Sequence, residues 1–279
     1  MTAETVPAID RYAVIGCPAR HSLSPRLHAH FAELTGEAIE YRAIELDENK
    51  FESFWDSEAG RRLSGANITL PFKERAFRLV TGRRPQAVAA GAVNTIMRID
   101  GQLIGDNTDG FGLVRDLEEN LGWCVRDRRI LVVGAGGAAR GVVAALRTRG
   151  PAHIVVANRT VARAEALSAL FPEVEAVPLD KPGSGFDGVI NATSTGHRGE
   201  PPALPASVAA GRPWAYDLSY GKAAEPFQSW CKAHGVTRFA DGMGMLVEQG
   251  AESFRLWRGV RPPTTDIIPM LRRLHSPTG

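Results

Sequence analysis

The sequence predicts an α/β fold with two domains, each built on a sheet of mostly parallel strands covered by helices. Short apolar runs alternate with helical patterns from residue 11 to about 100, which is the rhythm of β-α-β units. A second alternation surrounds the glycine-rich stretch VVGAGGAARG at 132–141. The 279 residues are enough for one large domain or two ordinary domains with a buried core.

The first segment begins with an apolar strand, YAVIG at 12–16, and a helix in SPRLHAHFAELTG at 24–36. Ser24 is expected to cap this helix, with Pro25 in its first turn. The Asp-Gly pair at 100–101 predicts the two-residue turn of a hairpin. The other predicted elements are strands at 41–46 and 66–70 and helices near 48–59 and over 72–80.

The second segment begins with a helix near Asp109 and continues as an apolar strand, RILVVG at 129–134. The helix that follows is expected to end at Gly150, because glycine commonly terminates helices. Further strands are predicted at 153–159, 186–191 and 214–220, with a helix at 160–171. This order is typical of a doubly wound α/β domain.

After about residue 242 the chain has two helical patterns and no strand, at 244–259 and 263–274. These helices need a surface to pack on, and one option is that the chain returns to the first domain.

Composition and charge exclude several classes of protein. The net charge is +2, with 33 basic and 31 acidic residues well mixed, so no nucleic-acid-binding face is expected. The three cysteines are far apart, which fits a reducing cytosol rather than a disulfide framework or a zinc site. No signal peptide is expected, and no apolar run is long enough to predict a membrane span. The seven histidines do not cluster, so no metal site is expected.

The strongest local motif is a dinucleotide-binding fingerprint. Gly134, Gly136 and Ala139 fit the pattern G-x-G-x-x-G/A between a predicted strand and a predicted helix. Gly134 permits the tight turn, Gly136 lets a pyrophosphate approach the backbone, and Ala139 allows close packing of helix on strand. The helix N-terminus then offers amides to the phosphates. The alternative is a glycine-rich turn in a domain that binds no nucleotide.

The end of the next strand favours NADP over NAD. NAD sites usually have an acidic residue there for the ribose 2′-hydroxyl. This chain has Asn158, Arg159 and Thr160 instead, with Arg163 one helical turn further on. An arginine can pair with a 2′-phosphate, which a carboxylate would repel. The alternative is an ordinary surface arginine beside a threonine helix cap.

Small polar residues lie at or near the ends of the predicted strands and helices of the first segment. In a parallel sheet, ligands collect beyond the carboxyl ends of the strands, so these groups suit a compact, hydroxyl-rich substrate. Lys73 and Asp109 could act as a coupled proton donor and acceptor. Singly, each residue has an ordinary structural explanation as a cap, a turn residue or a surface charge. The set comprises Ser22, Ser24, Asn67, Thr69, Lys73, Asn94 and Asp109.

Taken together, the motifs resemble those of the shikimate dehydrogenase family, in family order over nearly the whole chain. They are SLSP (22–25), GANITLPFK (65–73), AGAVNT (90–95), GDNTDG (105–110), VVGAGGAARG (132–141), NRT (158–160), NATSTG (191–196), YDLSY (216–220) and ADGMGMLVEQGAESF (240–254). The resemblance implies an NADP-dependent oxidoreductase of aromatic amino-acid biosynthesis. It would reversibly reduce 3-dehydroshikimate to shikimate in the cytoplasm as a monomer or homodimer, without a metal.

The same resemblance assigns residues and domains. Lys73 and Asp109 would be the catalytic pair, and Ser22 and Ser24 would hold the substrate carboxylate. Residues 1–109 would bind substrate, 110–241 would form a Rossmann-type NADP domain, and 242–279 would complete the first domain. The polyol pocket would be lined by Asn67, Thr69, Asn94, Tyr220 and Gln249. The cofactor would be contacted by Gly134, Ala135, Gly136, Gly137, Ala138, Asn158, Arg159, Thr160, Arg163, Thr193, Leu218 and Gly242.

Two positions depart from the family pattern, and three alternatives stay open. Leu218 stands where many relatives have methionine, and Pro85 where many have an acidic residue. The first alternative is a quinate/shikimate dehydrogenase that prefers NAD, against which Arg159 argues. The second is a non-catalytic NADP-binding sensor on the same scaffold. The third is a folate-type dehydrogenase of similar architecture, which would not need the SLSP serines.

Overall fold

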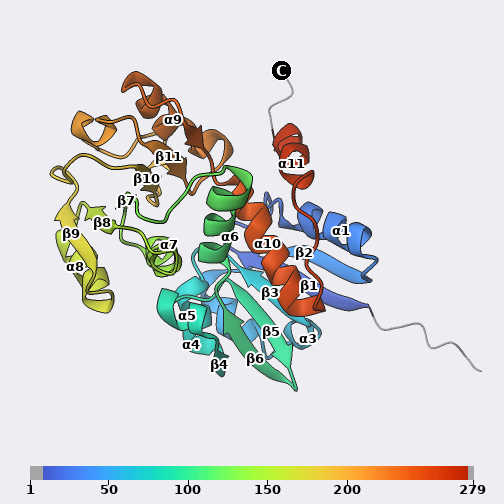
Figure 1. Ribbon diagram of the computed structural model, residues 1–279. Coiled ribbons are helices and arrows are strands. Elements are labelled where there is room, and N and C mark those ends of the chain that lie inside the picture. Colours follow the sequence, from blue (N-terminus) through green and yellow to red (C-terminus); the bar gives the residue numbers. More distant parts are fainter. Residues whose placement is uncertain (1–8, 276–279) are drawn as a thin grey trace, which may run out of the picture.

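The structure, a computed structural model, describes residues 9–275 as two sheets of six strands each, with helices packed around them (Figure 1). None of the helices in the described range is long and apolar enough to cross a membrane. The two-domain α/β class predicted from the sequence is confirmed.

The first sheet is mixed, with strand order β2-β1-β3-β5-β6-β4. β1 pairs in parallel with β2 and β3, and β4 with β6, whereas β3–β5 and β5–β6 are antiparallel. The predicted hairpin joins β5 to β6, and both of its turn residues, Asp100 and Gly101, have positive φ (50° and 78°). The strands are β1 Asp10–Gly16, β2 Ile39–Glu45, β3 Gly65–Ile68, β4 Gly82–Arg83, β5 Thr95–Ile99 and β6 Gln102–Asp106.

The predicted helix near 48–59 is wrong as a single element. The segment folds as three short pieces, η1 Glu48–Lys50, α2 Phe51–Phe54 and α3 Glu58–Arg61. The break has a local cause, because the Ser57 hydroxyl accepts a hydrogen bond from the Gly60 amide and so starts a new turn. The other helices of this segment are α1 Ser24–Thr35, α4 Lys73–Leu79 and α5 Pro85–Ala90.

The start of α1 differs from the expected capping. Ser24 is the first helical residue rather than the cap, and Leu23 occupies the cap position. The Ser24 amide instead donates to the Ser22 hydroxyl at 3.2 Å. Pro25 lies in the first turn, as predicted.

The second sheet is entirely parallel, with strand order β12-β11-β10-β7-β8-β9. This is the doubly wound arrangement expected from the glycine-rich motif. The strands are β7 Arg129–Val133, β8 His153–Asn158, β9 Val174–Pro178, β10 Gly188–Asn191, β11 Trp214–Asp217 and β12 Phe239–Ala240. The main helices are α7 Gly137–Arg147, α8 Val161–Leu170 and α9 Glu225–Ala233.

Two long-range helices join the halves of the molecule. α6, Asp109–Arg115, leaves the first sheet and continues as a π-helical turn at Asp116–Asn120. α10, Met243–Arg258, lies beside α6 and also contacts α1, while α11, Ile267–His275, packs on α10 (Figure 1). Leu27 and Phe31 of α1 share a core with Val247 and Phe254 of α10. The C-terminal helices therefore return to the first sheet, as expected.

A buried polar seam holds α6, α10 and the second sheet together. The Tyr216 hydroxyl of β11 donates to Asp116 Oδ2 at 2.7 Å and accepts from the Met245 amide at 3.2 Å. Burial raises the pKa of the Asp116 carboxyl. Gly244 makes this approach possible, because a Cβ there would lie 2.0 Å from Asp116 Oδ1.

We predict that Gly244→Ala lowers the free energy of unfolding by about 2–4 kcal/mol, because the added methyl group displaces the Asp116 carboxylate. Urea unfolding of the purified protein measures the change. Gly141→Ala in α7 is the matched control, since its Cβ would lie an ordinary 3.5 Å from Ala90. The control should be neutral or slightly stabilising. Equal stability of the Gly244→Ala variant and the wild type would contradict the role given to this glycine.

Candidate active site

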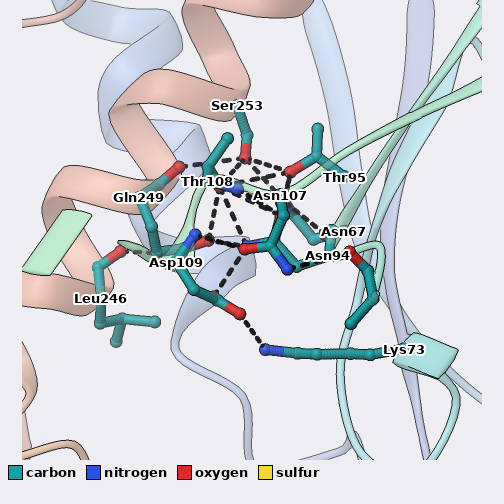
Figure 2. Close-up of polar contacts among 11 residues, drawn as sticks. Asn67, Lys73, Asn94, Thr95, Asn107, Thr108, Asp109, Leu246, Gln249 and Ser253 are labelled. Atoms are coloured by element: carbon teal, nitrogen blue, oxygen red, sulfur yellow. Dashed lines mark hydrogen bonds and ion pairs between the residues drawn. The ribbon is translucent and has the colours of Figure 1, made fainter. Parts of the chain in front are cut away.

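Lys73 and Asp109 form an ion pair at the carboxyl edge of the first sheet. Each is the first residue of a helix, Lys73 of α4 and Asp109 of α6. Lys73 Nζ lies 2.5 Å from Asp109 Oδ2, and the two side chains point toward one another in Figure 2. The lysine side chain is 24% exposed and the aspartate 10%, so the pair is shielded but still reachable.

The pair is oriented by Asn94, which precedes β5. Asn94 Nδ2 donates to Asp109 Oδ1 at 2.8 Å, while its Oδ1 accepts from the Thr108 amide at 2.8 Å. Both ends of the carboxamide are therefore occupied, and its orientation is defined. One carboxylate oxygen of Asp109 is held by Asn94 and the other by Lys73. An ammonium group has three donors, so two protons of Lys73 remain for a ligand.

The helix dipoles act on the two charges in opposite directions. A carboxylate is favoured in the first turn of a helix, which suits Asp109, whereas a cation is disfavoured there. The Asp109 carboxylate offsets this effect for Lys73. The sequence predicted Lys73 in the first turn of its helix, and the structure confirms that placement.

A cluster of buried hydroxyls behind the pair is not anticipated by the sequence analysis. Ser253 Oγ of α10 lies 2.8 Å from Thr95 Oγ1 and 3.2 Å from Thr108 Oγ1, and accepts from Asn67 Nδ2 at 2.9 Å (Figure 2). The one sequence signal for it is the repeated Asn-Thr pair at 94–95 and 107–108. Nothing in the sequence marks Ser253, because its partners in this cluster are 145 or more residues away along the chain.

Five of the residues proposed for substrate binding and catalysis come together in this network. Gln249 Oε1 lies 3.3 Å from Asn94 Nδ2, and Gln249 Nε2 donates to the Leu246 carbonyl at 2.9 Å. Asn67 joins the network through Ser253, and its Oδ1 accepts from the Tyr41 hydroxyl at 2.8 Å. The assembled group is Asn67, Lys73, Asn94, Asp109 and Gln249.

The remaining four residues, Ser22, Ser24, Thr69 and Tyr220, have local contacts of their own. Ser22 Oγ donates to Ser24 Oγ at 3.1 Å, just after β1. Thr69 follows β3, and its methyl group lies 2.3 Å from the position that a Cβ of Gly16 would take. Tyr220 packs against the core shared by α1 and α10, and burial raises the pKa of its phenol.

The glycine-rich turn has the geometry of an anion site. Gly134 has a φ of 107°, which glycine adopts without strain, and a Cβ there would lie 3.1 Å from the Ala192 carbonyl. Gly136 precedes α7, and no atom lies within 4 Å of its Cβ position, so the space is open. Ala139 is fully buried against the strand, as the fingerprint requires. The α7 N-terminus thus presents free amides to an open surface.

The end of β8 is exposed and carries no acidic side chain. Arg159 and Arg163 are exposed, while Asn158 Nδ2 donates to the Thr160 carbonyl at 2.9 Å. Thr160 occupies the cap position of α8, but its hydroxyl makes no capping hydrogen bond. The two guanidinium groups and this hydroxyl can therefore meet a phosphate.

Two loops at the carboxyl ends of β10 and β11 are organised by Asp217, whose side chain is fully buried. Asp217 accepts from Asn191 Nδ2 at 2.9 Å and from the Ser219 amide at 2.8 Å. Asn191 in turn accepts from the Thr193 hydroxyl at 2.7 Å. Burial raises the pKa of Asp217 to about 6.

Leu218 and Gly242 meet beside these loops. A Cβ on Gly242 would lie 2.3 Å from the Leu218 carbonyl oxygen, so only glycine permits this approach. The part of the chain that the structure describes contains no group of acidic, histidine and cysteine side chains that could hold a metal ion.

Family models match three stretches of the chain. The model described as "Shikimate dehydrogenase substrate binding domain" matches residues 14–96. "Shikimate / quinate 5-dehydrogenase" matches residues 116–198, and "Shikimate 5'-dehydrogenase C-terminal domain" matches residues 242–268.

Curated relatives match over nearly their whole length. The shikimate dehydrogenase (NADP(+)) of Alkalilimnicola ehrlichii is 51% identical over 266 residues, covering 94% of this chain and 98% of that protein. The protein of the same name from Hahella chejuensis is 46% identical, with coverages of 95% and 99%.

Solved structures also match this chain over nearly its whole length. The Ael1 enzyme from Pseudomonas putida superposes with a TM-score of 0.87 at 44% identity, covering 94% of this chain and 98% of that one. The shikimate 5-dehydrogenase of Thermus thermophilus, in complex with NADP(H) and shikimate, has a TM-score of 0.84 at 36% identity, with coverages of 95% and 99%.

The raised pKa of Asp217 predicts an unusual pH dependence of stability. The folded value of about 6 exceeds the ordinary 3.8, so the folded protein binds this proton more tightly than the unfolded chain. Its contribution to stability is fully present below pH 3.8 and is lost as the pH rises through about 6. The stability of the wild type relative to Asp217→Asn should therefore fall by about 2–3 kcal/mol between pH 4 and pH 7.

Urea unfolding of both proteins across this pH range measures the effect. Subtracting the variant removes the titration of all other groups. A difference that stays constant with pH would show that the Asp217 carboxyl titrates as in the unfolded chain.

Proposed function

The chain belongs to the shikimate dehydrogenase family, and we propose that it reversibly reduces 3-dehydroshikimate to shikimate with NADPH, using Lys73 and Asp109 to handle the proton. It is an NADP-dependent oxidoreductase acting on a CH–OH group. The observation that carries the proposed chemistry is the shielded ion pair of Lys73 and Asp109, with two ammonium protons left for a ligand.

The substrate is held by small polar groups. Ser22 and Ser24, whose hydroxyls lie 3.1 Å apart, take the carboxylate at the start of α1. The ring hydroxyls are bound by side chains that can both donate and accept, namely Asn67, Thr69, Asn94, Tyr220 and Gln249. The convergence of Asn67, Asn94 and Gln249 on one buried network supports this assignment.

In the reduction, NADPH supplies the hydride when bound. Lys73 donates a hydrogen bond and then its proton to the carbonyl oxygen, which becomes the hydroxyl group of shikimate. Asp109 keeps the ammonium directed at that oxygen, and Asn94 keeps Asp109 in place. In the reverse direction the neutral amine of Lys73 removes the hydroxyl proton.

The residues that would hold NADP follow the carboxyl edge of the second sheet. Amides at the start of α7 bind the pyrophosphate, from Gly134, Ala135, Gly136, Gly137 and Ala138. The 2′-phosphate is bound by Asn158, Arg159, Thr160 and Arg163. Thr193, Leu218 and Gly242 contact the nicotinamide end, and the hydrogen bonds of Asp217 support this part of the site.

The proposed domain division agrees with these assignments of substrate-binding and cofactor-binding residues. Residues 1–109 bind substrate, 110–241 bind NADP, and 242–279 complete the substrate domain, with 1–8 and 276–279 lying outside the described residues. The packing of α10 against α6 and α1 supports this division. The protein works in the cytoplasm as a monomer or homodimer.

Absorbance of NADPH formed from NADP and shikimate tests the function. Turnover should be fastest with this pair, and slower with NAD or quinate. Preference for NAD with quinate would favour the quinate/shikimate alternative. Binding of NADP without turnover of any polyol acid would instead support a sensor.

Lys73→Ala should lower kcat on the order of 10²–10⁴-fold, because it removes the positioned general acid. Binding of NADP, measured by fluorescence titration, should be unchanged. Lys50→Ala is the matched control, since Lys50 is an exposed lysine paired only with Asp47 at the surface. Near-normal turnover of pure Lys73→Ala protein would rule out the catalytic role.

Arg159→Ala should raise the KM for NADP about 10- to 100-fold, because a charge-assisted contact to the 2′-phosphate contributes roughly 1.5–3 kcal/mol. The KM for NAD, which lacks this phosphate, should change little. Arg273→Ala, at an exposed position of α11, is the control. Equal changes in both KM values would contradict recognition of the 2′-phosphate by Arg159.

A further inference from the structure

His28 is a buried polar residue that the catalytic scheme does not use. It lies on α1 one turn after Ser24, and its side chain is 0% exposed. Within residues 9–275, neither ring nitrogen has a hydrogen-bond partner. An unsatisfied buried polar group costs stability, so a phenylalanine of similar shape would be more favourable here unless the nitrogens serve a purpose.

Aromatic side chains hold the imidazole in place without satisfying it. The ring stacks on Tyr41 with centroids 4.1 Å apart and an interplanar angle of 3°. The edge of Phe31 packs against it at 5.5 Å, and Phe254 of α10 lies 6.1 Å away. Burial lowers the pKa of His28 to about 3, so the ring is neutral and has one N–H donor and one acceptor.

The polar group next to the ring is the carboxamide of Asn67. Asn67 partly opposes this lowering of the pKa of His28, as a nearby group able to accept from the ring does, although it makes no hydrogen bond to the ring in this structure. Asn67 Oδ1 already accepts from the Tyr41 hydroxyl at 2.8 Å, which leaves it one lone pair. Gly250 lets α10 approach α1 here, because a Cβ would lie 2.8 Å from Leu27 Cδ2, and the same position is 3.7 Å from His28 Nε2.

We propose that His28 is a positioning residue for Asn67: in the substrate complex its ring N–H donates to the second lone pair of Asn67 Oδ1. Together with the Tyr41 hydroxyl, it then fixes the carboxamide with its nitrogen directed at Ser253 and the polyol pocket. A free carboxamide can turn over and present oxygen where the site needs donors. In this structure Asn67 Nδ2 donates to Ser253 and to the Asn94 carbonyl, and His28 adds a second donor on the oxygen side without contacting the substrate.

The inference rests on the proposed function, because it assigns Asn67 to the polyol pocket. It separates binding from chemistry, since the side chain of Asn94 orients Asp109, whereas Asn67 contacts Asn94 at the backbone carbonyl, at 3.3 Å. Loss of the imidazole nitrogens should therefore weaken substrate binding while the hydride and proton steps proceed as before.

The test is His28→Phe, which keeps the stacking on Tyr41 and removes both nitrogens. The KM for shikimate should rise about 5- to 10-fold, as expected for one hydrogen bond. The kcat and the KM for NADP should stay within about 2-fold. The urea midpoint should rise, because an unsatisfied buried group is gone. A purely structural histidine would give either no kinetic change or a loss of stability.

His30→Phe is the matched control on the same helix. Its ring pairs with Glu33 at 3.3 Å, with both side chains partly exposed, so its kinetics should match the wild type. Tyr41→Phe removes the other donor to Asn67 Oδ1 and should raise the same KM. If His28→Phe does not fold, Tyr41→Phe still tests whether a donor to Asn67 Oδ1 affects the KM for shikimate.

A double-mutant cycle shows whether the effect passes through Asn67. In an Asn67→Ala background, His28→Phe should leave the KM for shikimate unchanged. An unchanged KM in the single variant, or an equal rise in the Asn67→Ala background, overturns the proposal. The absence of shikimate turnover by the wild type would instead overturn the proposed function, so the two failures are distinguishable.

Discussion

The hydroxyl group of Ser253 connects the parts of the molecule on which the site depends. Its hydrogen bonds join α10 to Asn67 at the end of β3, to Thr95 at the start of β5 and to Thr108 before α6. Because these groups are buried, each one has to find a protein partner. A helix near the C-terminus is thus required to complete a network built from the first 110 residues. This constraint explains why the chain returns to the first sheet after forming the second.

The site also contains groups that reduce stability. A lysine begins α4, where the helix dipole disfavours a cation, and the histidine beneath Asn67 has no hydrogen-bond partner. Asp217 is buried, and the structure gives it amide partners but no cation. Such features concentrate at functional sites, because binding and catalysis need groups that a stable core would exclude. Here they follow the carboxyl edges of both sheets, where the substrate and the cofactor are proposed to meet.

Local sequence patterns predicted the central elements better than the peripheral ones. The apolar strands around the glycine-rich turn and the Asp-Gly hairpin were predicted because their signals lie within a few residues. The prediction of one helix near 48–59 was wrong, because the Ser57 cap divides a helical pattern that looks continuous in the sequence. The edge strands β4, β9 and β12 were missed. β9 pairs only with β8 and carries a polar residue, so its sequence lacks a continuous apolar run.

The sequence by itself determined the fold class, the glycine-rich turn, the basic end of β8 and the chemical identity of the proposed site. These depend on backbone conformations and residue types that each short segment carries. Only the tertiary structure decided which groups meet. Contacts such as Asn67 with Ser253, 186 residues apart, depend on how helices pack across the whole chain. The same holds for His28, whose burial and lack of partners arise from α1, β2 and α10 closing around it.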